Sequence, residues 1–180
     1  MTAFTVTVQD QGVQATLQLL RERLQNMRPV LLTLGEQIVE RTKQRFATST
    51  GPDGQAWAPN SIATLAMVSG SLGKGYRKKN GDLNAKGQKT LAGKKPLIGQ
   101  SKDLSRQIVY AATGNTLTVS STPVYAAMQQ FGGVTSARSM IPGKTIPARP
   151  FLPVRQDGTL YPQEQQLVLQ TLNDFLMDGL

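Results

Sequence analysis

The clearest pattern in the chain is an apolar stripe in its first quarter. From Val13 to Ile38 the apolar residues are spaced alternately by four and three positions, which places them on one face of a helix. Pro29 removes a backbone donor within this series, so we expect a long helix, kinked or briefly broken near Arg28, that runs to about Phe46. The stripe consists of Val13, Leu17, Leu20, Leu24, Met27, Leu31, Leu34 and Ile38.

Two structural interpretations fit this stripe. It is either the seam of a coiled coil between subunits or the face with which the helix packs on its own sheet. The run barely exceeds three heptads, which is short for a coiled coil. Packing on the chain's own sheet is therefore the favoured interpretation.

Alternation of apolar and polar residues predicts strands in two places. Residues 4–8, FTVTV, indicate a half-buried strand, after which Asp10 can cap the following helix. The segments 106–111 and 116–120 flank turn residues at 113–115 and predict a β-hairpin with one apolar face. That face is formed by Ile108, Tyr110, Leu117 and Val119.

Helical signals recur in the second half of the chain. Residues 126–131 predict a helical turn that ends at Gly132-Gly133, a good C-terminal stop. Pro162 suits a first helical turn and precedes apolar positions at helical spacing up to Leu176. We therefore predict a single α+β domain over residues 1–180, with an antiparallel β-sheet, a long N-terminal helix and a C-terminal helix.

Residues 146–154 read IPARPFLPV and predict a stiff, extended strap or edge strand. Each proline fixes its own φ and biases the residue before it to extended geometry. Phe151 and Leu152 are expected to fill the core. Arg149 then either points towards an acidic group or a backbone carbonyl, or is a surface charge on a loop, and the spacing does not decide between these.

Most of the positive charge lies in one segment. The net charge is +9 at pH 7, and +7 of it falls between Gly70 and Lys95, where Asp82 is the one acidic residue. Residues 69–96 also contain six glycines and show neither a helical nor a strand period. Low hydrophobicity with high charge predicts a long, mobile, Gly-rich basic loop. Its basic residues are Lys74, Arg77, Lys78, Lys79, Lys86, Lys89, Lys94 and Lys95.

The composition offers no residue set for catalysis. Cysteine and histidine are absent, which excludes thiol and imidazole nucleophiles and ordinary zinc sites. The acidic residues are scattered, and no Gly-rich phosphate loop is present. We expect a protein that is not an enzyme and uses no cofactor or metal. With no visible secretion signal and no apolar run of about 20 residues, we expect it in the cytoplasm, without a membrane partner.

Several phrases of the chain are informative when they are taken together. YAAMQQFGG at 125–133 is followed by IPARPFLP at 146–153. GPDGQAWAPNSIATL at 51–65 has a tryptophan after Pro-x-Gly, and LIGQSKDLSRQIVY at 97–110 leads into the hairpin. VRQDGTLYPQEQQLVLQTL at 154–172 places an acidic turn before a helix. Taken in order, these phrases resemble the phage virion morphogenesis family, a tail-completion group of Mu-type phages and related prophages. The resemblance runs from about Arg41 to Leu172.

One position departs from the family's pattern. Ser101-Lys102 stands where the family commonly has Ser/Thr-Gly. A turn that relied on the positive φ of glycine would be altered at this point. The departure concerns one local turn before the hairpin, and the other phrases are unaffected.

The resemblance implies a structural role. Such proteins are similar to neck and tail-terminator proteins, which form or cap a ring where the tail tube ends and the head connector begins. This implies a homo-oligomeric ring, a hexamer by likeness to tail terminators, that contacts the tail tube protein and head connector or neck proteins. It implies a place in the virion, at the tail or neck, after assembly in the host bacterial cytoplasm. The expected subunit interface or structural strap comprises Tyr125, Phe131, Gly132, Gly133, Arg149, Pro150 and Phe151.

The basic segment leaves three interpretations open. It is a plain solvated loop, it lines the ring's lumen and contacts DNA phosphates without reading sequence, or it contacts a neighbouring subunit. The alternative function is a sequence-nonspecific nucleic-acid-binding protein that acts through residues 69–96. Tyr76 is the only aromatic residue there, so platforms for base stacking are missing.

Overall fold

The computed structural model describes residues 10–139 and 141–178, so the strand predicted at 4–8 lies outside the described residues. The predicted α+β class is confirmed, with two small antiparallel sheets among several helices. In chain order the elements are α1 (Gln11–Gln25), α2 (Arg28–Thr48), α3 (Ile62–Ser71), the 3-10 turn η1 (Lys74–Tyr76), α4 (Ala85–Ala92), α5 (Asp103–Arg106), β1 (Ile108–Thr113), β2 (Thr116–Ser121), α6 (Ala126–Phe131), β3 (Gly133–Val134), β4 (Thr145–Ile146) and α7 (Pro162–Met177).

The predicted long helix is broken next to its proline. The carboxylate of Asp10 accepts hydrogen bonds from the backbone N of Gly12 and Val13 at 2.8 and 3.2 Å, and so caps α1 as expected. α1 ends at Gln25 and α2 starts at Arg28. Pro29 therefore falls in the first turn of α2, where its missing N–H breaks no helical hydrogen bond.

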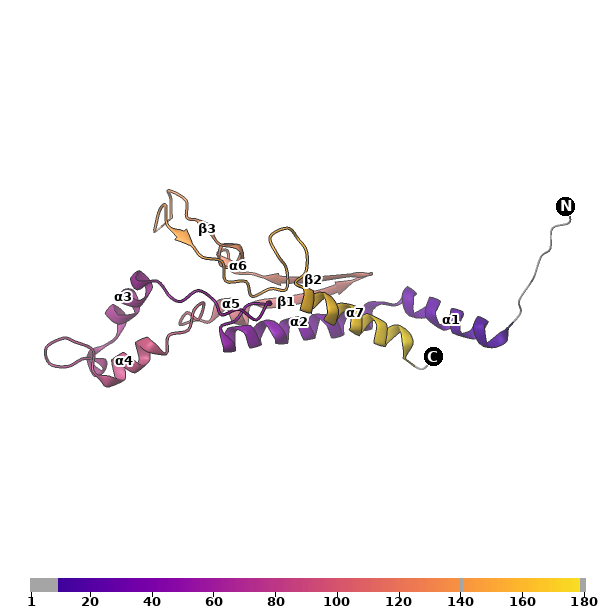
Figure 1. The fold of residues 1–180 in the computed structure, drawn as a ribbon, viewed down its shortest axis with the longest axis horizontal. Coiled ribbons are helices and arrows are strands. Elements are labelled where there is room, and N and C mark those ends of the chain that lie inside the picture. The colour runs from indigo at the N-terminus through magenta and orange to yellow at the C-terminus, as the bar shows by residue number, and fades with distance from the viewer. Residues whose placement is uncertain (1–9, 140, 179–180) are drawn as a thin grey trace.

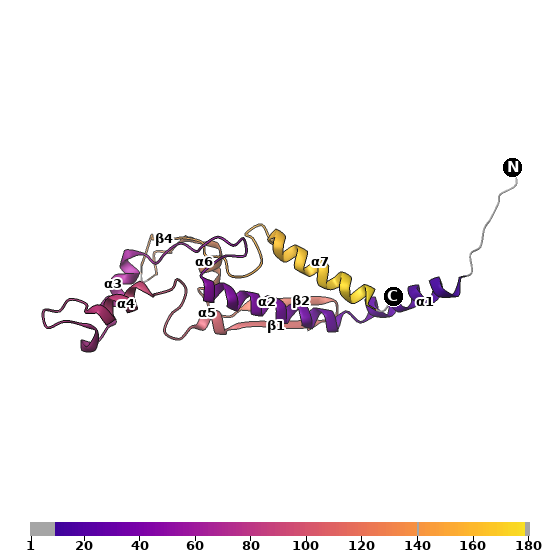
Figure 2. The same ribbon diagram turned by 60° about the horizontal axis from the view of Figure 1, so that its bottom comes forward.

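α2 lies between the hairpin and α7 and joins two parts of the core (Figure 2). Near its start, Val30, Leu31 and Leu34 pack between the hairpin and α7. Near its end, Val39 and Phe46 belong to a second cluster. Packing of the stripe on the chain's own sheet is thus confirmed for α2. The other members of the second cluster are Trp57, Leu104, Ile108, Ala126 and Phe151.

The predicted hairpin is confirmed. β1 and β2 pair antiparallel from Ile108 opposite Ser121 to Thr113 opposite Thr116, around a two-residue turn. A Cβ added at Gly35 of α2 would lie 2.2 Å from the ring of Tyr110, so glycine lets the helix approach the hairpin closely. A second small sheet, β3 with β4, was not predicted from the sequence.

The molecule is elongated, with α1 at one end and α3 and α4 at the other (Figure 1). Unlike α2, α1 leaves much of its apolar stripe in solvent: Val13, Leu17 and Leu24 are 54%, 60% and 52% exposed. The seam between subunits therefore remains a prediction for α1.

The prediction of an irregular loop over residues 69–96 is wrong. With α3, this segment forms a folded arm (residues 61–96) that contains η1 and α4. Asn84 caps α4 by accepting a hydrogen bond from the backbone N of Gly87 at 3.0 Å. Arg77 donates to the carbonyls of Ser69 and Gly81 at 2.6 and 2.8 Å. The arm is built by helix caps and by hydrogen bonds from side chains to the backbone. Such interactions do not require apolar residues at regular spacing, so they leave no periodic signal in the sequence. Its mobility remains a prediction.

Candidate functional site

The proline-rich strap (residues 146–154) passes through the core. Phe151 is completely buried, and its ring centroid lies 5.3 Å from that of Phe46. Phe46 in turn meets Trp57 edge to face, also at 5.3 Å. The expected core role of Phe151 is confirmed, and the three rings join the strap, α2 and the segment after α2.

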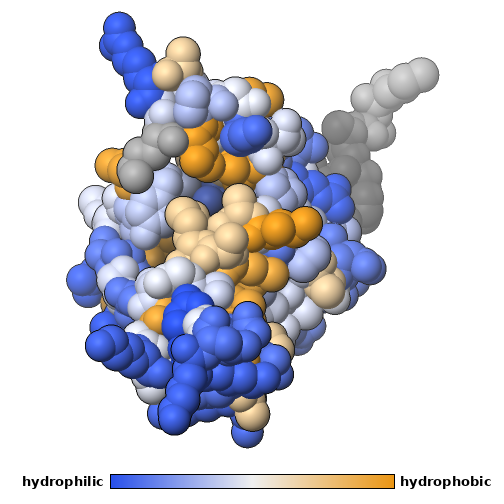
Figure 3. All heavy atoms as spheres, turned by 90° about the vertical axis from the view of Figure 1, so that its left-hand side faces the viewer, coloured by the Kyte–Doolittle hydropathy of each residue, from blue (hydrophilic) through white to orange (hydrophobic). Residues whose placement is uncertain are grey.

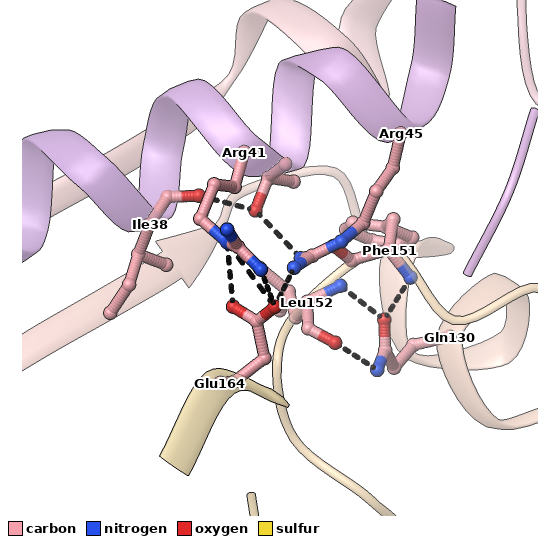
Figure 4. A network of polar contacts seen from close by, with 8 residues as sticks. Ile38, Arg41, Arg45, Gln130, Phe151, Leu152 and Glu164 are labelled. Carbon is pink, nitrogen blue, oxygen red and sulfur yellow. Dashed lines mark hydrogen bonds and ion pairs between the residues drawn. The ribbon is translucent and has the colours of Figure 1, made fainter. Parts of the chain in front are cut away.

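One side chain takes the place of a neighbouring strand. The Oε1 atom of Gln130 accepts hydrogen bonds from the backbone N of Phe151 and of Leu152, both at 2.9 Å. Its Nε2 atom donates to the carbonyl of Leu152 at 3.2 Å (Figure 4). The same atom also donates to the carbonyl of Val154 at 2.9 Å. A strap with three prolines cannot form a regular ladder, so its buried polar groups need such partners.

Two further side chains bind carbonyls of the strap. The indole N of Trp57 donates to the carbonyl of Pro150 at 2.9 Å. Arg45 donates to the carbonyl of Phe151 at 2.8 Å. Together with Gln130 they satisfy the backbone of the strap from α2, from α6 and from the segment after α2, and this fixes its path.

Arg45 also belongs to a buried ion cluster. Glu164, in the first turn of α7, is 1% exposed, and its Oε1 atom lies 2.7 Å from an Nη2 atom of both Arg41 and Arg45 (Figure 4). Burial alone would raise the pKa of Glu164, but the hydrogen bonds and charges of the two arginines lower it. Burial lowers the pKa of Arg45 despite this partner. The cluster holds α7 and the strap to α2.

Arg149 is buried, at 8% exposure, and the interpretation as a surface charge is wrong. Its Nε and Nη2 atoms donate to the carbonyls of Ala58 and Pro59, both at 2.8 Å. Burial lowers its pKa. The alternative in which Arg149 points to a backbone carbonyl is confirmed. The guanidinium fixes the strap to the segment that leads into the arm.

The two glycines of YAAMQQFGG lie where α6 ends against the strap. Gly132 has a φ of +72°, and a Cβ there would lie 2.8 Å from the backbone N of Ala148. The close approach and the positive φ both require glycine. Gly133 pairs with Ile146 in the second sheet.

The expected interface residues divide into two groups. Arg149 and Phe151 lie inside the subunit, with Pro150 held between them by Trp57. Tyr125 and Phe131 are 44% and 38% exposed. The first group forms the structural strap, whereas contact of Tyr125 and Phe131 with a neighbouring subunit remains a prediction.

Sequence reasoning missed four residues of this site, namely Arg41, Arg45, Gln130 and Glu164. A signal for the arginines was present, because the alternating spacing that passes through Ile38 continues to Arg41 and Arg45. A charged residue in phase with a buried stripe predicts a buried partner of opposite charge. Nothing in the sequence distinguishes Gln130 from its neighbour Gln129.

The basic residues of the arm divide by their contacts. Arg77, Lys94 and Lys95 donate to backbone carbonyls, and Lys86 lies over the ring of Tyr76 at 4.8 Å. Such contacts hold the arm together and tie it to the body. The side chains of the remaining four make no hydrogen bond or ion pair among residues 10–139 and 141–178. They are Lys74, Lys78, Lys79 and Lys89.

An apolar groove separates the arm from the body. Its volume is about 670 Å³, and Met67, Leu72, Leu97 and Tyr125 contribute to its lining. Figure 3 looks at this end of the molecule and shows an apolar patch bordered by hydrophilic residues. Within the part of the chain that the structure describes, no acidic cluster is arranged to hold a metal, and no helix is long and apolar enough to cross a membrane.

Comparison with known sequences assigns the chain to a family. The chain belongs to the phage virion morphogenesis family, whose model matches residues 8–176. It is therefore a phage protein of virion morphogenesis, as the ordered phrases indicated. No curated protein matches the chain significantly, and no solved structure does.

Proposed function

We propose that this protein is a non-enzymatic component of the phage neck that completes the tail or joins it to the head as a ring. Membership of the virion morphogenesis family supports a structural role. The observation that carries the finer proposal is an elongated subunit with exposed apolar side chains at both ends. The ring lies at the neck end of the tail, between the tail tube protein and the head connector or neck proteins.

The two ends offer different surfaces. At one end, α1 presents Val13, Leu17 and Leu24. At the other, Ile62 and Met67 are 88% and 68% exposed, next to the apolar groove. Contact between unlike surfaces of identical chains is heterologous, and such contacts close into a ring when the rotation permits. A hexamer is the ring order that the family resemblance implies.

The location of the protein in purified virions tests this proposal. Virions are labelled with a gold-conjugated antibody against the full-length protein and examined by electron microscopy. Label at the junction of head and tail supports the proposal. Label along the tail shaft, at the distal tail tip or on the head surface contradicts it.

A second candidate function is nucleic-acid binding through the arm, favoured by the four lysines without internal partners. The four are replaced together by glutamine, and the full-length variant is compared with wild type in DNA gel shifts and in assembly. Loss of both DNA binding and joining favours this candidate. If joining survives while the gel shift is lost, DNA binding by the arm is incidental to assembly.

A further inference from the structure

A cationic cleft lies where the arm meets the body, outside the strap and next to the apolar groove, with which it shares Lys95 and Ile98. Its volume is about 550 Å³. Four basic side chains line it, and none of the described residues in its lining is acidic. They come from α2, from the end of the arm and from both ends of α5. The four are Lys43, Lys95, Lys102 and Arg106.

The described carboxylates do not neutralise these cations. Both ion pairs among residues 10–139 and 141–178 involve Glu164, in a different part of the fold. Asp103 neighbours Lys102 in sequence, but its side chain accepts hydrogen bonds from Ser101 and Gln107 at 2.5 and 3.4 Å. Lys95 donates to the carbonyl of Ala47 near the end of α2. Four like charges around one cleft repel each other, and a bound anion would relieve this repulsion.

Lys102 stands in the cleft at a backbone cost. Its φ is +58°, in the left-handed region that is unfavourable for residues other than glycine. The expectation that lysine would alter this turn is wrong, because the backbone keeps a conformation that suits glycine. A strained residue at such a point motivates a functional role for its side chain. Here that side chain adds one positive charge to the cleft.

We infer that this cleft binds the phosphodiester backbone of duplex DNA. The lining offers Lys and Arg donors, which bind phosphates without reading base sequence. Lys95 belongs both to the cleft and to the basic arm, so the row of basic side chains extends from the cleft into the arm. This row is longer than a single phosphate group needs, and it suits the repeated phosphates of a DNA backbone. DNA binding at the cleft does not depend on the place of the protein in the virion.

The test is fluorescence anisotropy of a labelled duplex of about 20 base pairs, titrated with full-length protein between about 50 and 200 mM salt. The cleft variant is Lys43→Gln with Arg106→Gln. The matched control is Arg138→Gln with Lys144→Gln, which removes the same charge from the loop between β3 and β4. Both pairs are exposed, so both variants should fold, and their melting temperatures are compared with wild type.

The cleft variant should lose about tenfold in affinity, and its slope of log K against log salt should flatten by about two, one unit for each lost phosphate contact. The control should lose less than about threefold. Equal losses in the two variants would overturn the inference, because the attraction would then be diffuse. It would also be overturned if wild type does not bind, or if inorganic phosphate at the same phosphate concentration displaces the duplex.

Lys102→Gly provides an independent readout. Relief of the positive φ should raise the melting temperature, while loss of the charge should lower DNA affinity about threefold or more. A merely structural lysine would not produce these opposite changes. An unchanged DNA affinity in this variant would overturn the role of the cleft.

Discussion

Gln130 binds the backbone of Phe151 as a neighbouring strand would, with its Oε1 atom 2.9 Å from the backbone N of Phe151 and of Leu152. The amide also donates to two carbonyls of the strap. Around Phe151 the prolines prevent a regular ladder, so this side chain from α6, together with Trp57 and Arg45, fixes the position of the strap. The stability of the body therefore depends on Gln130, although nothing in the sequence distinguishes it from its neighbour Gln129.

Replacement of Gln130 by alanine should destabilise the protein by about 2–4 kcal/mol, because buried N–H and C=O groups of the strap lose their partners. Chemical denaturation measures this difference. Gln129→Ala is the matched control, since the Oε1 atom of Gln129 is buried without a hydrogen-bond partner among the described residues. Equal losses for the two neighbours would show that Gln130 does not organise the strap.

Phe151→Ala should reduce the free energy of unfolding by about 3–5 kcal/mol, because a completely buried ring leaves a cavity between Phe46 and the strap. Phe131→Ala removes the same group from a position 38% exposed and should cost about 1 kcal/mol or less. Thermal melts of both variants test the comparison. A Phe151→Ala variant that melts like wild type would contradict the core role of the strap.

Glu164→Gln should destabilise the protein at neutral pH by about 3–5 kcal/mol, since it leaves the buried Arg45 without its counter-charge. The folded pKa of Glu164 lies below its unfolded value of about 4.3. Its stabilisation is therefore complete above about pH 4.3 and is lost as the pH falls through the folded pKa.

Urea denaturation of wild type and of Glu164→Gln at a series of pH values measures this effect. The difference between the two proteins should be constant above about pH 4.3 and shrink below it. Other carboxylates titrate in both proteins, so their contributions cancel in the difference. One of them is Asp157, whose pKa is lowered mainly by hydrogen bonds from Thr159. A difference that stays constant down to acid pH would show that Glu164 is not the titrating group.

Gly132→Ala should destabilise more than Gly54→Ala, although both glycines have a positive φ, of +72° and +79°. A Cβ at Gly54 meets no atom within 4 Å, so only backbone strain of about 1–2 kcal/mol is added. At Gly132 the same Cβ also meets the backbone of the strap at 2.8 Å. Denaturation midpoints separate the two effects. Equal losses would mean that the strap moves aside freely.

The sequence predicted what periodicity and turn chemistry encode. The broken long helix followed from the stripe and Pro29, and the hairpin followed from alternation around a glycine turn. The burial of Phe151 followed from the stiffness that three prolines impose. Each of these features depends on residues close together in the chain, so local rules sufficed.

The parts that sequence reasoning missed depend on contacts between distant segments. Gln130 and the strap residues it binds are separated by some twenty positions, and Glu164 lies 119 residues after Arg45. The arm was missed for a different reason, because Asn84 and Arg77 hold it by hydrogen bonds that have no hydrophobic period. Lys102 shows that tertiary context can impose a glycine-like φ on another residue.

The most direct test of the proposed role is electron microscopy of lysates from a phage that lacks this gene, with and without the protein supplied in trans. The account predicts full heads beside separate tails, which complementation rejoins into complete virions. Tails of irregular length would assign the protein to tube termination in particular. Normal virions in the absence of the gene would contradict the account.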